Sequence, residues 1–443
     1  MKGFPILGER LYLRSPSINV CFRTIIRETF DKKEIENVIE KVCIKHPFLN
    51  SFLEIDDENE TWLVSKNDPM GIEYYKSNEM DFLTWYKKTD NTVFDFSHGP
   101  LVKFCVIMGT NSEPRRGEAS SSNTEIIILG HHIIGDGIGY LNLLKDILLA
   151  LDNRLVLNPQ IPPYEDKDKY FKDTVLLDTG VHLYACGLNA EWRKSRVKFS
   201  EKEYLDFFKQ YRNKYVPGLY MASVEGDNSK KILKKSRLNG LTVNELIASA
   251  FSVSAMETLN SKEIRLGVAV NIRNEIVSEP NVCMGNFVTG IAVKVNNDTS
   301  KDFISNAKAI SSLLKEQLLN LKNRHMVVHF LGVFDKDLLE VIMPEAYGNL
   351  NHPVPKKLAE LIGEQTENKG VGISNLGRYN FTGYNNFNVL DIQFIEPAFP
   401  ANLLTVGVIT VNNKFNFCLR YNEGEIKADA IKVICENAIN LLR

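Results

Sequence analysis

A chain of 443 residues exceeds what one hydrophobic core usually supports, so we expect two lobes that share an interface. The 53 Lys and Arg residues nearly balance the 55 Asp and Glu residues, which leaves no electrostatic reason to expect nucleic acid or an anionic membrane as a partner. Seven scattered cysteines without a CxxC pair, an N-terminus unlike a signal peptide and the lack of a long apolar run predict a cytoplasmic protein with reduced thiols and no membrane span.

The first predicted helix begins after Asp31, which stands at capping-box spacing from Glu34, and its apolar residues recur at intervals of three and four until the helix stops before Pro47. Strand-like segments follow at 51–55, 61–65 and 94–109. Segment 110–124 is rich in Gly, Pro and Ser and lacks periodicity, which predicts a mobile loop between two paired strands. We interpret this loop as a solvated hairpin tip without a function of its own.

A buried strand, "EIIILGHH" at 125–132, runs through "IIGDG" into an apolar helix that ends near residue 151. The polar segment 152–180 is rich in Pro, Asp and Lys, and it predicts a boundary between an N-terminal lobe, 1–165, and a C-terminal lobe, 166–443.

In the second half, Thr242 and Glu245 predict a capped helix, and residues 300–323 predict a long helix with one apolar face. Strands are predicted at 264–272, 287–295, 370–376, 388–395, 403–411 and 414–421. Helices and strands mix in both halves, so the fold class is α/β or α+β. The C-terminus repeats the strand–turn–helix order of 125–151 without a histidine, from which we infer two lobes of related architecture; a chance likeness between two common units is the alternative.

The adjacent residues His131 and His132 are the main candidates for chemistry. Consecutive side chains of a strand point to opposite faces, and no further ligand stands at a usual interval, so a metal site is not indicated. One imidazole can instead accept a proton near neutral pH. Gly135 and Gly137 permit a tight turn, and Asp136 can hold a cationic partner. A histidine at a strand end is often structural, but this combination favours catalysis.

Other catalytic patterns are missing from the sequence. We find no G-x-S-x-G elbow, no cysteine in an activating context and no phosphate-binding glycine loop. The pattern therefore favours direct transfer from an activated donor to an acceptor, without a covalent acyl-enzyme.

The run His131-His132-Ile133-Ile134-Gly135-Asp136-Gly137 resembles the HHxxxDG signature of the CoA-dependent acyltransferase superfamily. That superfamily includes chloramphenicol acetyltransferase, the condensation domains of nonribosomal peptide synthetases, and stand-alone polyketide-associated and alcohol acyltransferases. Other segments match it in the expected order, at 45–54, 94–104, 240–250, 284–290 and 373–379. The DFGWG motif of the plant branch is absent and we expect no attached carrier or adenylation domain, so the stand-alone branch matches best.

The resemblance implies two chloramphenicol-acetyltransferase-like lobes in a V-shaped pseudodimer, with a channel between them that donor and acceptor enter from opposite faces. It implies that His132 is the general base and that His131 and Asp136 are structural, with Asp136 in a salt bridge to Arg273; Gly137 completes the motif.

On the second lobe, the resemblance implies that Ser374 binds the oxyanion, with Asn375 as a weaker candidate in the same cleft. The alternative for "SNLGR" is a turn between strands.

The implied function is transfer of an acyl group from a pantetheine thioester, either acyl-CoA or an acyl carrier protein, to a small-molecule alcohol or amine. No tightly bound cofactor is implied, and a monomer suffices because the interface that builds the site is internal. One alternative is a condensation-like, amide-forming enzyme whose substrates are attached to acyl or peptidyl carrier proteins. Another is an inactive member that binds a carrier protein or an acyl ligand.

Overall fold

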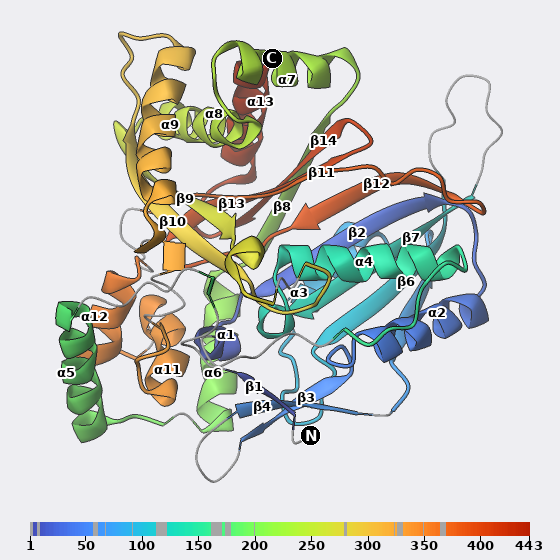
Figure 1. The fold of residues 1–443 in the computed structure, drawn as a ribbon, viewed down its shortest axis with the longest axis horizontal. Helices are drawn as coiled ribbons and strands as arrows, with labels where there is room; N and C mark the ends of the chain where they lie inside the picture. The colour runs from blue at the N-terminus through green and yellow to red at the C-terminus, as the bar shows by residue number, and fades with distance from the viewer. Residues whose placement is uncertain are drawn as a thin grey trace.

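The protein is a mixed α/β structure with three sheets, as Figure 1 shows, and this confirms the predicted fold class. The computed structural model describes residues 3–6, 9–55, 61–66, 68–90, 92–111, 122–160, 171–172, 179–198, 200–278, 281–322, 324–325, 331–348, 350–363 and 369–443. The predicted lobe boundary at 165/166 lies outside these residues, and it stays a prediction together with the V-shaped pseudodimer. None of the helices described there is both long enough and apolar enough to cross a bilayer.

The five-stranded sheet carries the histidine pair. Its order is β12 (Asn388–Ile395), β2 (Asn19–Arg27), β7 (Ser122–His131), β6 (Val102–Asn111) and β5 (Ile72–Lys76). Strands β6 and β7 pair antiparallel, as predicted for the flanks of segment 110–124, whose residues 112–121 lie outside the described part of the chain. Helices α2 (Lys32–Lys45) and α4 (Gly137–Leu151) cover one face of this sheet (Figure 1). Helix α2 begins at the predicted capping box of Asp31 and Glu34.

The six-stranded sheet comes from the second half of the chain. Its order is β10 (Val288–Asn296), β9 (Glu263–Asn271), β11 (Gly370–Tyr379), β13 (Asn402–Val411), β14 (Lys414–Asn422) and β8 (Pro217–Val224). Helices α7 (Asp227–Leu238), α8 (Val243–Thr258), α9 (Phe303–Leu319) and α13 (Ala428–Leu442) gather on one side of it (Figure 1). Helix α8 begins at the predicted capping box of Thr242 and Glu245, and the apolar face of α9 is buried in this layer.

Strand β12 links the two halves. It lies late in the sequence, yet it pairs antiparallel with β2 and so extends the N-terminal sheet, with Ile395 opposite Cys21. It also contacts the C-terminal sheet, because a Cβ atom on Gly407 of β13 would lie 2.3 Å from the carbonyl oxygen of Phe394. Only glycine permits this approach of the two backbones.

A helical layer packs at the end of the two large sheets. It consists of α1 (Arg10–Leu13), α5 (Thr179–Ser195), α11 (Lys336–Ala346) and α12 (Pro353–Leu361), which share a buried apolar core. The remaining elements are a small sheet of β1 (Phe4–Ile6), β4 (Thr61–Ser65) and β3 (Ser51–Ile55), helices α3 (Phe82–Asp90) and α6 (Glu201–Lys214), and the short helices η1 (His132–Ile134) and η3 (Arg273–Glu275).

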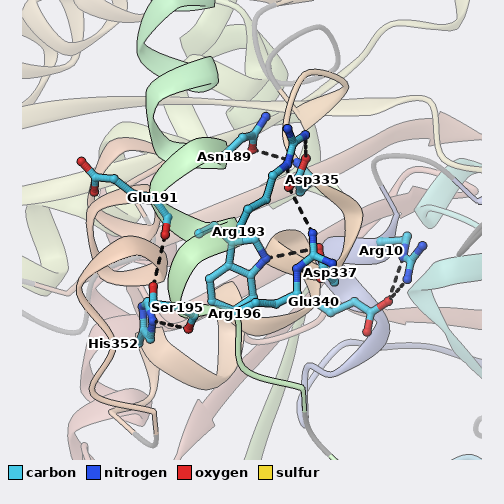
Figure 2. A network of polar contacts seen from close by, with 11 residues as sticks. Arg10, Asn189, Glu191, Arg193, Ser195, Arg196, Asp335, Asp337, Glu340 and His352 are labelled. Atoms are coloured by element: carbon cyan, nitrogen blue, oxygen red, sulfur yellow. Dashed lines mark hydrogen bonds and ion pairs between the residues drawn. The ribbon is translucent and has the colours of Figure 1, made fainter.

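Ion pairs fix the helices of this layer to one another, as Figure 2 shows. Arg193 of α5 donates two hydrogen bonds, of 2.8 and 2.7 Å, to Asp335 at the start of α11. Arg10 of α1 donates through Nε to Glu340 of α11, over 2.8 Å. Helix α1 is thereby tied to α11, and this tie positions Tyr12, the residue two places after Arg10.

A buried ion pair connects the N-terminal half to the C-terminal sheet. Arg420 of β14 donates through Nη2 to Asp90 Oδ2 at the end of α3, over 2.8 Å, and the two side chains are 0% and 1% exposed. Asn19 donates to the other oxygen of Asp90. Removal of the carboxylate therefore leaves a guanidinium buried without its charge partner.

We predict that Asp90→Ala lowers the free energy of unfolding by about 3–5 kcal/mol, because it leaves a buried, uncompensated cation. Urea unfolding followed by circular dichroism measures the change. The matched control is Lys87→Ala, which breaks a second ion pair from α3 to the C-terminal half, with Glu423; its side chains are 46% and 41% exposed. Solvent screens that pair, so we expect a loss of at most about 1 kcal/mol. Equal losses in the two variants would contradict the assigned role of the buried pair.

Candidate functional site

A cavity of about 820 Å³ lies between the two large sheets and the helical layer. Its wall includes Val20 and His132 from the N-terminal half, Gly267 and Ser374 from the C-terminal sheet, and Tyr12 from α1. Residues from both halves of the chain therefore face one shared space.

The two histidines diverge where β7 ends. His131 is the last residue of β7, and its Nδ1 accepts a hydrogen bond from the backbone N–H of Ile133, over 3.2 Å. Its ring packs edge-on against Phe94 and Phe96, and burial lowers its pKa to about 3, with a smaller contribution from His132. His132 begins η1 and lines the cavity. His131 is thus a neutral, packed side chain, whereas His132 borders open space.

Asn286 fixes the tautomer of His132. Its Nδ2 donates to two backbone carbonyl oxygens, those of His132 at 2.7 Å and Ile133 at 3.3 Å, so this side of the amide must be the NH₂ group. Its Oδ1 then lies 2.7 Å from His132 Nδ1, which must carry the hydrogen. The other ring nitrogen, Nε2, is left with its lone pair, and it makes no hydrogen bond to the residues that the structure describes.

The surroundings of His132 favour its neutral form. Burial lowers its pKa below the ordinary value, although Asp136 and Asn286 oppose this effect. The ring of Tyr12 lies 4.7 Å from the imidazole, between centroids, and covers part of it. At neutral pH His132 can therefore accept a proton at Nε2.

Asp136 organises the turn that follows. Its two oxygens accept hydrogen bonds of 2.8 and 2.7 Å from Arg273, which is the salt bridge that the resemblance implies. They also accept from the backbone N–H groups of Gly139, at the start of α4, and Phe287. Burial by itself would raise the pKa of Asp136, but Arg273 and these hydrogen bonds hold that pKa below its usual value. The carboxylate joins three segments at one point.

Gly137 lies in tight packing beside this carboxylate. A Cβ atom at this position would lie 2.9 Å from the Leu376 side chain and 3.0 Å from the ring of Phe394, so a larger residue would force these side chains to move. The close contacts at this glycine are made by side chains from the second half of the chain.

The second-half candidates lie on β11, next to each other. Ser374 is buried, lines the cavity and makes no hydrogen bond through Oγ to any described residue. Asn375 also lines the cavity, but its Oδ1 accepts from the N–H of Gly377 at an irregularity in the pairing of β11 with β13. Ser374 is thus the hydroxyl available to a bound molecule, and Asn375 stabilises the local backbone.

Three residues of this site were not anticipated from the sequence. Asn286 lies inside the segment 284–290 that carries part of the resemblance, so the signal was present without a role attached to it. Tyr12 and Glu396 also line the cavity, and neither belongs to a motif. Among the residues with described positions, no group of three His, Cys, Asp or Glu side chains is placed to hold a metal ion.

We predict that Asp136→Ala lowers the free energy of unfolding by about 3–5 kcal/mol, since Arg273 remains buried without its carboxylate. Asp136→Asn keeps an acceptor for the two backbone N–H groups, and we expect a smaller loss. Asp227→Ala removes an exposed carboxylate from α7 and serves as the control, with little change expected in the unfolding midpoint. An Asp136→Ala protein that unfolds normally but has a shifted pH optimum would contradict the structural role.

We predict that ¹⁵N NMR of the imidazole shows His132 protonated at Nδ1 and bare at Nε2, because Asn286 accepts from Nδ1. Asn286→Ala frees Nδ1, and we expect the ring to exchange between its two tautomers. The spectrum of His132→Ala identifies which signals belong to this ring. A bare Nδ1 in the unmodified protein would show that the Asn286 amide has the opposite orientation.

Comparison with known proteins finds similarity both in sequence and in structure. No protein-family model matches the chain. Bacitracin synthase 1 of Bacillus licheniformis is 22% identical over 321 residues, which is 68% of this chain but only 6% of that much longer protein.

Several solved structures share the fold over nearly their whole length. The trichothecene 15-O-acetyltransferase of Fusarium sporotrichioides is 12% identical with a TM-score of 0.66, and the match covers 99% of this chain and 93% of that one. The first condensation domain of the calcium-dependent antibiotic synthetase is 10% identical with a TM-score of 0.62, and the match covers 100% and 95%. The chain therefore has the fold of condensation domains and CoA-dependent acyltransferases, as its HHxxxDG-like motif led us to expect.

Proposed function

We propose that the protein is an acyltransferase that moves an acyl group from a pantetheine thioester to a hydroxyl or amine acceptor, with His132 as general base. The observation that carries the proposal is the state of this ring. His132 is neutral, has Nδ1 held by Asn286, and lines a cavity that it shares with Ser374. This is the arrangement that a base requires when two substrates meet in one space.

The proposed reaction begins when Nε2 of His132 takes the proton of the acceptor as the acceptor oxygen or nitrogen attacks the thioester carbonyl carbon. The imidazolium that forms is stabilised through Nδ1–H by the amide oxygen of Asn286. Collapse of the tetrahedral intermediate breaks the carbon–sulfur bond, and the thiolate takes the proton from His132. The base returns to its starting state, and no group of the protein becomes acylated.

The oxyanion of the intermediate needs a fixed donor, and Ser374 is our candidate. Its hydroxyl lines the same cavity from β11, and no described residue accepts its hydrogen. A donor of this kind typically contributes about 10²–10³-fold in kcat. The acetyltransferase activity in the name of the Fusarium enzyme supports a reaction of this class.

A condensation-like, amide-forming reaction is the second candidate. The similarity to bacitracin synthase 1 and to a condensation domain favours it, because one is a synthase and the other is part of an antibiotic synthetase by name. In that reaction the same base would act on an amine, and the substrates would be attached to acyl or peptidyl carrier proteins. A member that binds a carrier protein or an acyl ligand without turnover is the third possibility.

Release of free thiol distinguishes these candidates. The purified protein is incubated with acetyl-, butyryl- or octanoyl-CoA, or with acyl carrier protein, and with a panel of alcohols and amines. Thiol release from acyl-CoA that depends on an acceptor supports the acyltransferase. Release only from the carrier protein supports the condensation-like reaction, and binding without release supports an inactive member.

We predict that His132→Ala lowers kcat by about 10²–10⁴-fold, because the general base is lost, while the protein stays folded. Thiol release gives the rate, and thermal unfolding tests the fold. The control is His98→Ala, which removes an exposed histidine that does not line the cavity. Turnover of His132→Ala near that of the unmodified protein would end the assignment of the base.

A further inference from the structure

Glu396 is an acidic residue of the cavity wall that the proposed reaction does not use. It follows the last residue of β12 and is partly exposed where it lines the cavity. Its Oε2 is buried and has no hydrogen-bond partner, and no ion pair to Glu396 occurs among the described residues. Asp136, an acid on the same wall, is by contrast fully bonded to Arg273 and backbone N–H groups.

An ionised carboxyl group in this position costs the fold free energy. Burial raises the pKa of Glu396 to about 8, and no cation among the described residues offsets this effect. A buried acid with a structural role normally has a partner. An acid that lacks one, beside a cavity, is a candidate for a ligand contact.

The charged and titratable neighbours do not supply that partner. Arg273 on η3 is neutralised by Asp136, and Arg265 on β9 donates to Asn402 instead. The other titratable side chains of the wall are Tyr12 on α1, His132 on η1, Tyr184 on α5 and Tyr379 on β11.

Strand register places Glu396 close to His132. Strand β12 pairs with β2 up to Ile395, and the bond from Ala398 N–H to the Ser17 carbonyl shows that the two backbones stay together beyond it. On the other side of the same stretch, His132 N–H donates to the Ile18 carbonyl. The backbones of Glu396 and His132 thus flank residues 18–20 and lie about 12 Å apart, two strand spacings across the sheet and two residues along it.

We propose that Glu396 binds a cationic nitrogen of the acceptor, and that the acceptor is therefore an amino alcohol or a diamine. This inference rests on the proposed function. The reacting hydroxyl or amine lies at His132, and the second nitrogen lies at Glu396, a few bonds away along the same molecule. A phosphate of a CoA donor would keep Glu396 in its neutral form, because the ionised carboxylate carries the same charge as the phosphate.

Binding of such an acceptor has a measurable consequence for protons. An acid with a pKa of about 8 is mostly protonated at pH 7, whereas its contact with an ammonium group requires the ionised form. Glu396 therefore releases about one proton when the cation binds at pH 7. Below pH 6 the cation has to displace this proton against a larger free-energy cost, so its affinity falls.

The first experiment compares ω-(dimethylamino)alkan-1-ols of three to eight carbons with alcohols in which CH replaces the nitrogen. The tertiary nitrogen is cationic at neutral pH and forms no stable amide, so only the hydroxyl is acylated. We expect kcat/KM to favour the cationic series at least about tenfold, with an optimum chain length, and Glu396→Gln to remove this preference. The control Glu423→Gln removes a surface carboxylate and should keep it.

Equal kcat/KM for the two series, or a preference that survives in Glu396→Gln, would overturn the inference and leave the acyltransferase proposal intact. If neither an alcohol nor an amine supports thiol release, the proposed function fails, and binding decides the inference alone. Calorimetry in buffers of different ionisation enthalpy then measures proton release when the dimethylamino alcohol binds to the unmodified protein at pH 7. Release of about one proton supports the site, and binding without release, or no binding, overturns it.

Discussion

The Asp136 carboxylate is the interaction on which the rest of the site depends. It accepts from Arg273 and Phe287 in the second half of the chain and from Gly139 at the start of α4. The bond to Phe287 fixes the backbone next to Asn286, whose side chain holds the ring and the carbonyl of His132. One buried charge thus controls both the turn that carries the imidazole and the segment that orients it.

The energetics of a buried ion pair explain why Asp136 is suited to this position, although burying its charge costs free energy. Taking a carboxylate and a guanidinium out of water offsets much of their attraction, so a buried ion pair contributes little net stability. It is directional, however, because the two parallel hydrogen bonds to Arg273 fix angles as well as distance. Apolar packing between the two halves would leave the position of His132 less defined.

The sequence is informative where the signal is local. Capping boxes at Asp31 and Thr242 predict the starts of α2 and α8, because a side chain three residues away completes each cap. Alternating or continuous apolar runs predict most strands of the C-terminal sheet, and segment 388–395 coincides with β12. The neighbours of β12 could not be predicted, because the residue pattern of a strand does not specify which strand it pairs with.

The residues of the site also divide into those with a local signal in the sequence and those without one. The histidine pair, Asp136 and the arginine opposite it could be proposed from a motif and a resemblance. Asn286 could not be given a role, because an amide acts on a histidine only through contacts between distant segments. Glu396 lies outside every motif. Its raised pKa comes from burial, and burial depends on the whole fold rather than on the local sequence "IEPAFP".

The crossing of β12 also constrains how the molecule is made. During synthesis β2 leaves the ribosome early, with an edge of unpaired amide and carbonyl groups and apolar side chains. That edge is covered only after residue 395 has emerged. Until then it is an open template for a strand of another chain. For the same reason, a fragment that ends between the halves is not a self-sufficient folding unit.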